Sequence, residues 1–146
     1  MTHNYHRYQH GSPELRWSPL LAVEALNWAE RLLRTESVQR SEAPERGENI
    51  AASGDRSFDV KSAMELWYKE GEDYDYDTPG FSSNTRNFTQ MLWAGSEEVG
   101  MALSRSEDGQ SVVIVARYYP PGNMVGLFQE HVKPKKRDSF GEESLD

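Results

Sequence analysis

The chain lacks cysteine and long apolar runs, and each absence excludes a class of protein. None of its 146 residues is cysteine, which excludes disulfides, thiolate zinc sites and cysteine nucleophiles and favours a reducing compartment. No apolar run approaches the length that crosses a bilayer. The first residues show neither a signal core nor the second-position glycine that myristoylation needs. We therefore expect a cytoplasmic protein, with an extracellular one as the alternative if an upstream signal is missing.

The chain also has no excess of positive charge. Its formal net charge is −8, which argues against binding nucleic acid or anionic membranes broadly, because phosphate recognition depends on clustered Lys and Arg. One local exception is a basic run at residues 133–137, directly before an acidic end at residues 138–146. We predict a disordered, charged tail over residues 135–146, and a membrane or nucleic-acid contact of the basic run is the alternative.

Aromatic residues are what the chain has in quantity. Four Trp, seven Tyr and five Phe supply large apolar area, although only 36% of the residues are hydrophobic. The length suffices for one core and not for two. The sequence predicts a single domain over residues 1–134, beginning within a truncated first helix.

Helix signals occur in the first half of the chain. Ser18-Pro19 is a capping hydroxyl followed by proline, and apolar residues then recur at helical spacing to about Arg34. A second helix is predicted from a cap at Ser57 or Asp59 to near Gly71. The polar residues 35–46 between them predict a loop with at most one short strand, near Val38.

The strongest strand signals come late. Residues 99–103 and 112–119 flank Asp108-Gly109, a dipeptide that favours a hairpin. Residues 112–116 are continuously apolar, which is typical of a central strand covered on both faces. A short helix is expected around Phe88, ending before Gly95. The pattern as a whole predicts a layered α+β sandwich.

Four short blocks follow one another between residues 3 and 134. They are residues 3–15, Gly47-Glu48-Asn49-Ile50-Ala51, the stretch from Trp67-Tyr68-Lys69-Glu70 to Phe88-Thr89-Gln90-Met91-Leu92-Trp93, and Ala116-Arg117-Tyr118-Tyr119-Pro120-Pro121-Gly122-Asn123. In this order they resemble the CAP superfamily, also called SCP or pathogenesis-related-1 domains. Without cysteines, the chain is most similar to the branch of Golgi-associated plant pathogenesis-related proteins. The resemblance implies a three-layer α-β-α sandwich with a central antiparallel sheet.

The resemblance also implies a cleft in which two His and two Glu can bind a divalent metal such as zinc. Glu48 and Glu70 occupy the two acidic positions. Asn87 stands where the family has one histidine, and the other position falls near Gln39 or Arg40. None of these replacements is an imidazole, so we predict a degenerate site with no metal and no cofactor.

An arginine near the two carboxylates would replace the charge of the metal, because close carboxylates repel one another unless a cation lies between them. We predict that Arg40 or Arg46 donates charge-assisted hydrogen bonds to Glu48 or Glu70. Gln90 completes the predicted set of cleft residues. The alternative is purely structural: Glu48 caps a backbone and Glu70 is an exposed helix acid.

Catalysis has little support in the sequence. Ser53 follows the Gly-Glu-Asn block, but the four histidines, His3, His6, His10 and His131, lie near the chain ends, and none lies at the cleft motifs. A carboxylate of ordinary pKa is a poor base for activating a serine. We predict that the protein is not an enzyme, and divalent-metal binding or weak serine-hydrolase activity remains the alternative.

A binding module is the function that remains. The resemblance implies recognition of a lipid, sterol or protein partner through the cleft and its loops, among them the acidic, aromatic loop at residues 73–81. Golgi-associated relatives are peripheral on acidic membranes and partly dimeric. For this chain we expect weak peripheral contact with Golgi membranes at most, no nucleic-acid partner, and leave a homodimer open.

Overall fold

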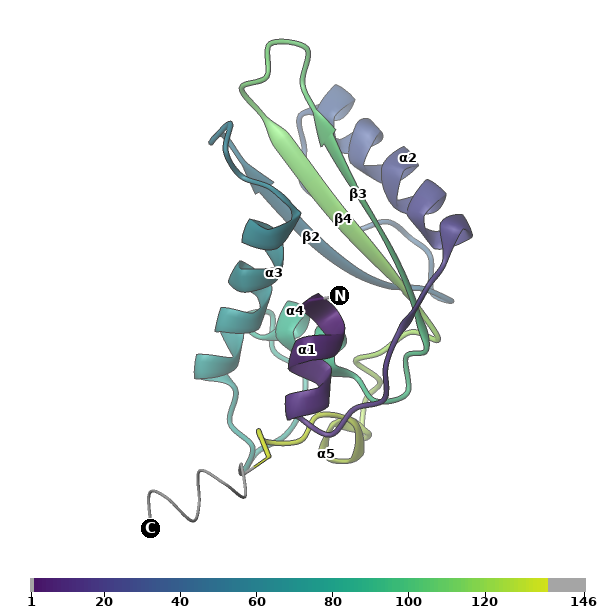
Figure 1. The fold of residues 1–146 in the computed structure, drawn as a ribbon, viewed down its shortest axis with the longest axis vertical. Helices are drawn as coiled ribbons and strands as arrows, with labels where there is room; N and C mark the ends of the chain where they lie inside the picture. The colour runs from purple at the N-terminus through teal and green to yellow at the C-terminus, as the bar shows by residue number, and fades with distance from the viewer. Residues whose placement is uncertain (1, 137–146) are drawn as a thin grey trace.

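A four-stranded sheet lies between two helical layers in the computed structural model, which describes residues 2–136 (Figure 1). The predicted α+β class with three layers is confirmed. The elements in chain order are α1 (Thr2–Gln9), β1 (Arg16–Trp17), α2 (Pro19–Thr35), β2 (Gly47–Ser53), α3 (Val60–Lys69), the 3₁₀ helix η1 (Glu70–Asp73), α4 (Arg86–Leu92), β3 (Glu98–Arg105), β4 (Val112–Tyr119) and α5 (Phe128–His131).

The strands are arranged in the order β1-β3-β4-β2. β3 and β4 form the predicted hairpin, and β2 pairs antiparallel with the other side of β4. β4 is therefore central, and residues 112–118 are buried as their apolar run predicts. The central strands are antiparallel as predicted, and the two-residue strand β1 adds a parallel pairing with β3 at one edge.

The pleat of β4 divides its side chains between two cores. Val113 and Val115 pack against buried residues of α2, whereas Ile114 and Tyr118 pack with buried residues of α3 and α4. Successive side chains of a strand point to opposite faces. Arg117 accordingly points toward α2, where its guanidinium meets an acidic side chain of that helix. Figure 1 shows α2 on one side of the sheet and α1, α3 and α4 on the other.

α2 begins as the sequence predicts. The hydroxyl of Ser18 accepts a hydrogen bond from the amide of Leu21 at 3.1 Å, and Pro19 occupies the first helical position. The helix lies very close to β3 at Gly100, where a Cβ atom would come within 2.1 Å of the amide nitrogen of Ala22. A glycine at this position is what allows the first turn of α2 to pack against the sheet.

The remaining helices differ from the predictions only at their ends. Asp59, rather than Ser57, caps α3 and forms a reciprocal capping box with Ser62. The predicted end near Gly71 falls inside η1, and the short helix around Phe88 is confirmed as α4. Residues 36–46 form a loop without the short strand considered near Val38.

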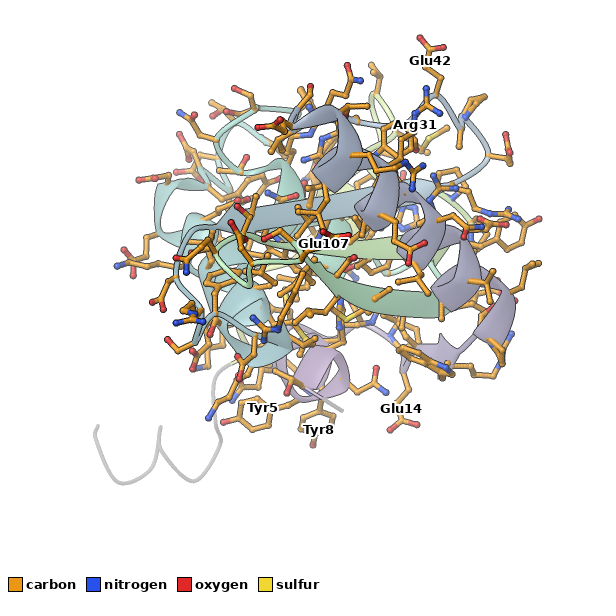
Figure 2. The ribbon with its side chains drawn as sticks, turned by 90° about the horizontal axis from the view of Figure 1, so that it is seen from above. Tyr5, Tyr8, Glu14, Arg31, Glu42 and Glu107 are labelled. Carbon is orange, nitrogen blue, oxygen red and sulfur yellow. The ribbon has the colours of Figure 1, made fainter. Side chains whose placement is uncertain are left out.

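α1 is amphipathic and is held to the domain by one arginine. His3 and Arg7 are buried, whereas Tyr5 and Tyr8 point outward (Figure 2). The Arg7 guanidinium makes hydrogen bonds of 2.8–3.1 Å to four backbone carbonyl groups, those of Pro13, Met91, Trp93 and Ser96. The first helix is thereby fastened to the segment that follows α4.

The predicted disordered tail lies almost wholly outside the described residues. Of that tail, residues 137–146 are not described. Lys136 contacts α1: its amide donates to the carbonyl oxygen of Gln9 at 2.6 Å, and its ammonium nitrogen lies 3.9 Å from the ring centroid of Tyr8. Within residues 2–136, the helices are all too short or too polar to cross a membrane.

Candidate functional site

Glu48 lies on the edge strand β2, opposite Arg117 of β4. Its carboxylate accepts hydrogen bonds from the amide of Ser41 at 3.0 Å and from the Ser41 hydroxyl at 2.5 Å. Arg117 forms an ion pair with it at 3.4 Å, and both side chains are nearly buried. The carboxylate therefore holds the loop at residues 36–46 against the sheet, and the cation beside it is one that the sequence analysis did not single out.

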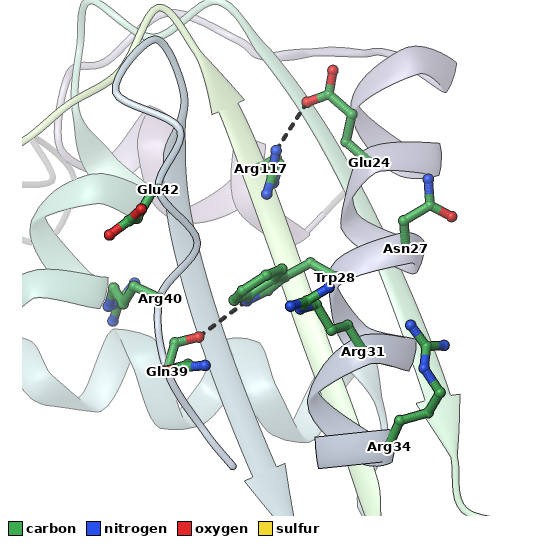
Figure 3. A pocket seen from close by; sticks show the side chains of 9 residues that line it. All are labelled: Glu24, Asn27, Trp28, Arg31, Arg34, Gln39, Arg40, Glu42 and Arg117. Atoms are coloured by element: carbon green, nitrogen blue, oxygen red, sulfur yellow. Dashed lines mark hydrogen bonds and ion pairs between the residues drawn. The ribbon is translucent and has the colours of Figure 1, made fainter. Parts of the chain in front are cut away.

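Arg117 and Arg46 share a second carboxylate, Glu24 of α2. Arg46 donates to both oxygens of Glu24, at 2.9 and 3.2 Å. Arg117 donates to one of them at 3.2 Å, as Figure 3 shows. The Arg46 hydrogen bond is the main reason that the pKa of Glu24 lies below its usual value, and it raises the pKa of Arg46 in return. The prediction that Arg46 bonds Glu48 or Glu70 is wrong, because Glu24 occupies its guanidinium.

Glu70 caps a helix to which it does not belong. Its carboxylate accepts hydrogen bonds from the backbone amides of Asn87 and Phe88, both at 3.0 Å, and from the side-chain amide of Asn87 at 2.8 Å. These backbone amides belong to the first turn of α4, where Thr85 provides no side-chain cap. A carboxylate satisfies the free amides of a helix N-terminus and complements its dipole. The description of Glu70 as an exposed helix acid is therefore wrong.

Arg40 crosses the edge of the sheet and joins β2 to α4. One end of its guanidinium donates to the backbone carbonyl of Glu48, and the other donates to the side-chain oxygen of Asn87 at 3.0 Å. Gln39 instead accepts a hydrogen bond at its backbone carbonyl from the indole of Trp28, so Arg40 is the residue that faces Asn87. Neither carboxylate side chain is its hydrogen-bond partner, which corrects the predicted contact.

The four positions therefore form a chain of hydrogen bonds. Arg40 donates to the backbone carbonyl of Glu48 and to Asn87, and Asn87 donates to Glu70, while the carboxylate of Glu48 accepts from Ser41. A guanidinium remains protonated in proteins and cannot ligate a metal. Within residues 2–136, no group of three or more His, Asp or Glu side chains gathers as metal ligands would. This donor set does not fit the family's zinc site.

Gln90 lies apart from this chain of hydrogen bonds. It is 1% exposed, accepts from the amide of Gly122 at 2.9 Å and donates to the hydroxyl of Ser96 at 3.1 Å. A Cβ atom on Gly47 would come within 2.0 Å of its side-chain oxygen. The structure places Gln90 in the interior, where it ties α4 to the segments after α4 and β4.

All four histidines contact aromatic residues of the motifs, which corrects the expectation that none would. His6 and His10 contact Tyr68, and His131 stacks on Trp93. His3 shares a hydrogen bond of 2.6 Å with the hydroxyl of Tyr118, and that hydroxyl also accepts from Asn49 at 3.2 Å. Burial lowers the pKa of His3 to about 3, with a further contribution from the charge of Arg7. Folding brings α1 back onto the centre of the sheet, which sequence position alone did not indicate.

Ser53 lies at the opposite end of β2 from Glu48. The strand register pairs Ser53 with Val112 and Glu48 with Arg117, so the two side chains are separated by about 17 Å of strand. The Ser53 hydroxyl accepts from the amide of Asp55 at 3.0 Å. This separation is far too large for Glu48 to remove a proton from Ser53.

Comparison with known proteins agrees with this architecture. The sequence profile of CAP, the Cysteine-rich secretory protein family, matches residues 2–118. Golgi-associated plant pathogenesis-related protein 1 of Homo sapiens is 39% identical over 141 residues, which span 92% of this chain and 90% of that protein. Pathogenesis-related protein 1 of Arabidopsis thaliana is 36% identical over 121 residues, which span 83% of this chain and 73% of that protein.

The fold is shared with solved structures as well. The structure of Schistosoma mansoni venom allergen-like protein 4 superposes with a TM-score of 0.67 at 22% identity, over 94% of this chain and 92% of that one. At this level of identity the likeness concerns the fold alone. Together with the profile match and the 39% identical relative, it shows that the chain belongs to the CAP family.

Proposed function

We propose that this protein is a non-catalytic binding domain that recognises a lipid, sterol or protein partner through its cleft and the adjacent loops, and that its metal site is degenerate. The observation that carries the proposal is the hydrogen bond between Arg40 and Asn87. Arg40 and Asn87 are hydrogen-bonded to each other, and the carboxylates of Glu48 and Glu70 accept from donors of the protein. These side chains therefore form a rigid surface and leave no open coordination positions for a metal ion.

Zinc titration tests the degenerate site. Calorimetry on the native chain should show no binding at micromolar zinc concentrations. The double substitution Arg40→His/Asn87→His is the matched comparison, because it supplies the two missing imidazoles beside the same carboxylates. We expect zinc binding to appear in this variant only.

Zinc binding by the native chain that is lost in Glu48→Gln/Glu70→Gln would overturn the degenerate site. Circular dichroism on each variant separates loss of a metal ligand from loss of fold.

The serine-hydrolase alternative has a direct test of its own. A fluorophosphonate probe should leave the protein unlabelled, since about 17 Å of strand separates Ser53 from Glu48. Labelling that disappears in Ser53→Ala would establish the hydrolase instead.

For location, we propose a cytoplasmic protein with at most weak peripheral contact with Golgi membranes. The absence of cysteine, the charge of −8 and the 39% identical Golgi-associated relative support this placement. Fluorescence imaging of the tagged chain tests the location, and recovery only from the secreted fraction would contradict a cytoplasmic protein.

The partners need two further experiments. Affinity capture from the source cells tests for a protein partner, and sedimentation of the purified chain tests for a homodimer.

A further inference from the structure

A polar groove opens between α2 and the loop at residues 36–46. Its volume is about 720 Å³. Figure 3 shows Arg31 and Arg34 projecting from α2, with Trp28 between them and the loop that carries Arg40. The residues that line the groove are Glu24, Asn27, Trp28, Arg31, Arg34, Gln39, Arg40, Glu42 and Arg117.

The groove is locally positive in an acidic protein. Four arginines and two glutamates line it, while the whole chain carries a net charge of −8. Glu24 is already neutralised by Arg46 and Arg117. Across the described part of the chain, Arg31, Arg34 and Arg40 form no ion pair. Among the described residues, the groove therefore carries arginine side chains that no ion pair neutralises.

Two of the arginines that line the groove are removed from solvent at some cost, Arg40 in part and Arg117 almost wholly. The pKa of Arg40 is lowered, first by burial and then by the neighbouring charge of Arg86. Arg117 is 9% exposed, and its Nε–H is buried without a hydrogen-bond partner among residues 2–136. An unpaired buried donor is unfavourable, and a positive cluster in a partly enclosed groove attracts an anion.

The kind of anion follows from the donors. Guanidinium groups match phosphate and sulfate oxygens with two parallel hydrogen bonds, and Arg31 and Arg34 lie three residues apart on one helix. The side-chain amides of Asn27 and Gln39 are exposed along the groove and suit hydroxyl groups. A volume of about 720 Å³ holds more than a single phosphate, so a polar body attached to the anion also has room.

We propose that this groove binds a ligand carrying a phosphate or sulfate group on a polar body, with Arg31 and Arg34 contacting the anion. The inference rests on the proposed binding function and adds a ligand class to it. The same chemistry occurs in a soluble phosphate ester and in the headgroup of a phospholipid.

Calorimetric titration of the full chain with pyrophosphate at low ionic strength tests the site. Arg31→Gln/Arg34→Gln should weaken binding by about tenfold or more, because two charge-assisted contacts are removed. Lys61→Gln/Lys69→Gln is the matched control, since it removes two exposed positive charges from α3, outside the groove. Its affinity should stay within about twofold of the native value.

Flotation with vesicles distinguishes the two sources. Binding to phosphatidylcholine vesicles that contain phosphatidic acid, lost in Arg31→Gln/Arg34→Gln, identifies a lipid headgroup, whereas pyrophosphate binding without flotation identifies a soluble ligand. The groove site is overturned if the native chain binds neither probe, or if both double variants lose binding equally. Partner capture that persists in Arg31→Gln/Arg34→Gln would leave the binding function standing after such a failure.

Discussion

Arg7 on α1 and the pair Arg31 and Arg34 on α2 show two opposite uses of the same side chain. Arg7 is fully buried, and its donors meet backbone carbonyls. Arg31 and Arg34 are exposed beside a groove and have no ion pair within residues 2–136. Loss of the buried arginine would leave several backbone carbonyl groups without hydrogen-bond donors. Loss of an exposed arginine would change mainly the electrostatic potential of the groove. Substitution of Arg7 should therefore lower the free energy of unfolding, whereas substitution of Arg31 and Arg34 should affect ligand binding.

The largest effect should come from Arg7→Ala. The substitution leaves buried carbonyl groups without donors and opens a cavity under α1, so we expect a loss of about 3–5 kcal/mol in the free energy of unfolding. Urea denaturation measures it, with the exposed Arg16→Ala as the control, expected within about 0.5 kcal/mol of the native value. A loss below about 1 kcal/mol for Arg7→Ala would show that the contacts of α1 are not needed for the fold.

Acid should destabilise the same region. The folded-state pKa of His3 is about 3, below its ordinary value of 6.5. Between these two pH values His3 is protonated in the unfolded chain and neutral in the folded chain. The stability contribution of neutral His3 is complete above pH 6.5 and falls as the pH drops toward 3. Between pH 7 and 4.5 this amounts to about 2–3 kcal/mol.

The measurement compares the pH dependence of unfolding in the native chain and in His3→Gln. The variant should lose less stability over this interval. Equal losses would place the acid sensitivity in other groups, such as His6 and His10, whose pKa values burial also lowers.

Glu70→Ala should have an intermediate effect. It removes the acceptor for the first amides of α4, and the loss of a helix cap costs about 1–2 kcal/mol. The exposed Glu72→Ala in η1 is the control, expected within about 0.5 kcal/mol of the native value. If both substitutions behave alike under denaturation, the capping role of Glu70 is wrong.

The smallest effect on stability should come from Arg31→Gln/Arg34→Gln. Both side chains are exposed on α2, so thermal denaturation should place the variant within about 0.5 kcal/mol of the native chain for each substitution. A clear loss of stability would show that these arginines support the fold, and the contrast with Arg7 would then fail.

Much of the fold could be predicted because its signals are local. Ser18-Pro19 starts α2, Asp59 caps α3 within one turn, and Asp108-Gly109 marks the turn between β3 and β4. β2 was harder to foresee, since Gly47–Ser53 is poor in residues that favour strands. Pairing with β4 supplies the hydrogen bonds that its composition does not indicate.

The sequence by itself determined the family, the layers and the candidate cleft residues Glu48, Glu70, Asn87 and Arg40. Only the tertiary structure decided what each of those residues contacts. Glu48 meets Arg117 through the register of β2 and β4, and Glu70 caps α4 because η1 packs against that helix. The reason is physical: caps and turns depend on neighbours within a few residues, whereas the partner of a charged side chain depends on which strands pair and which face it occupies.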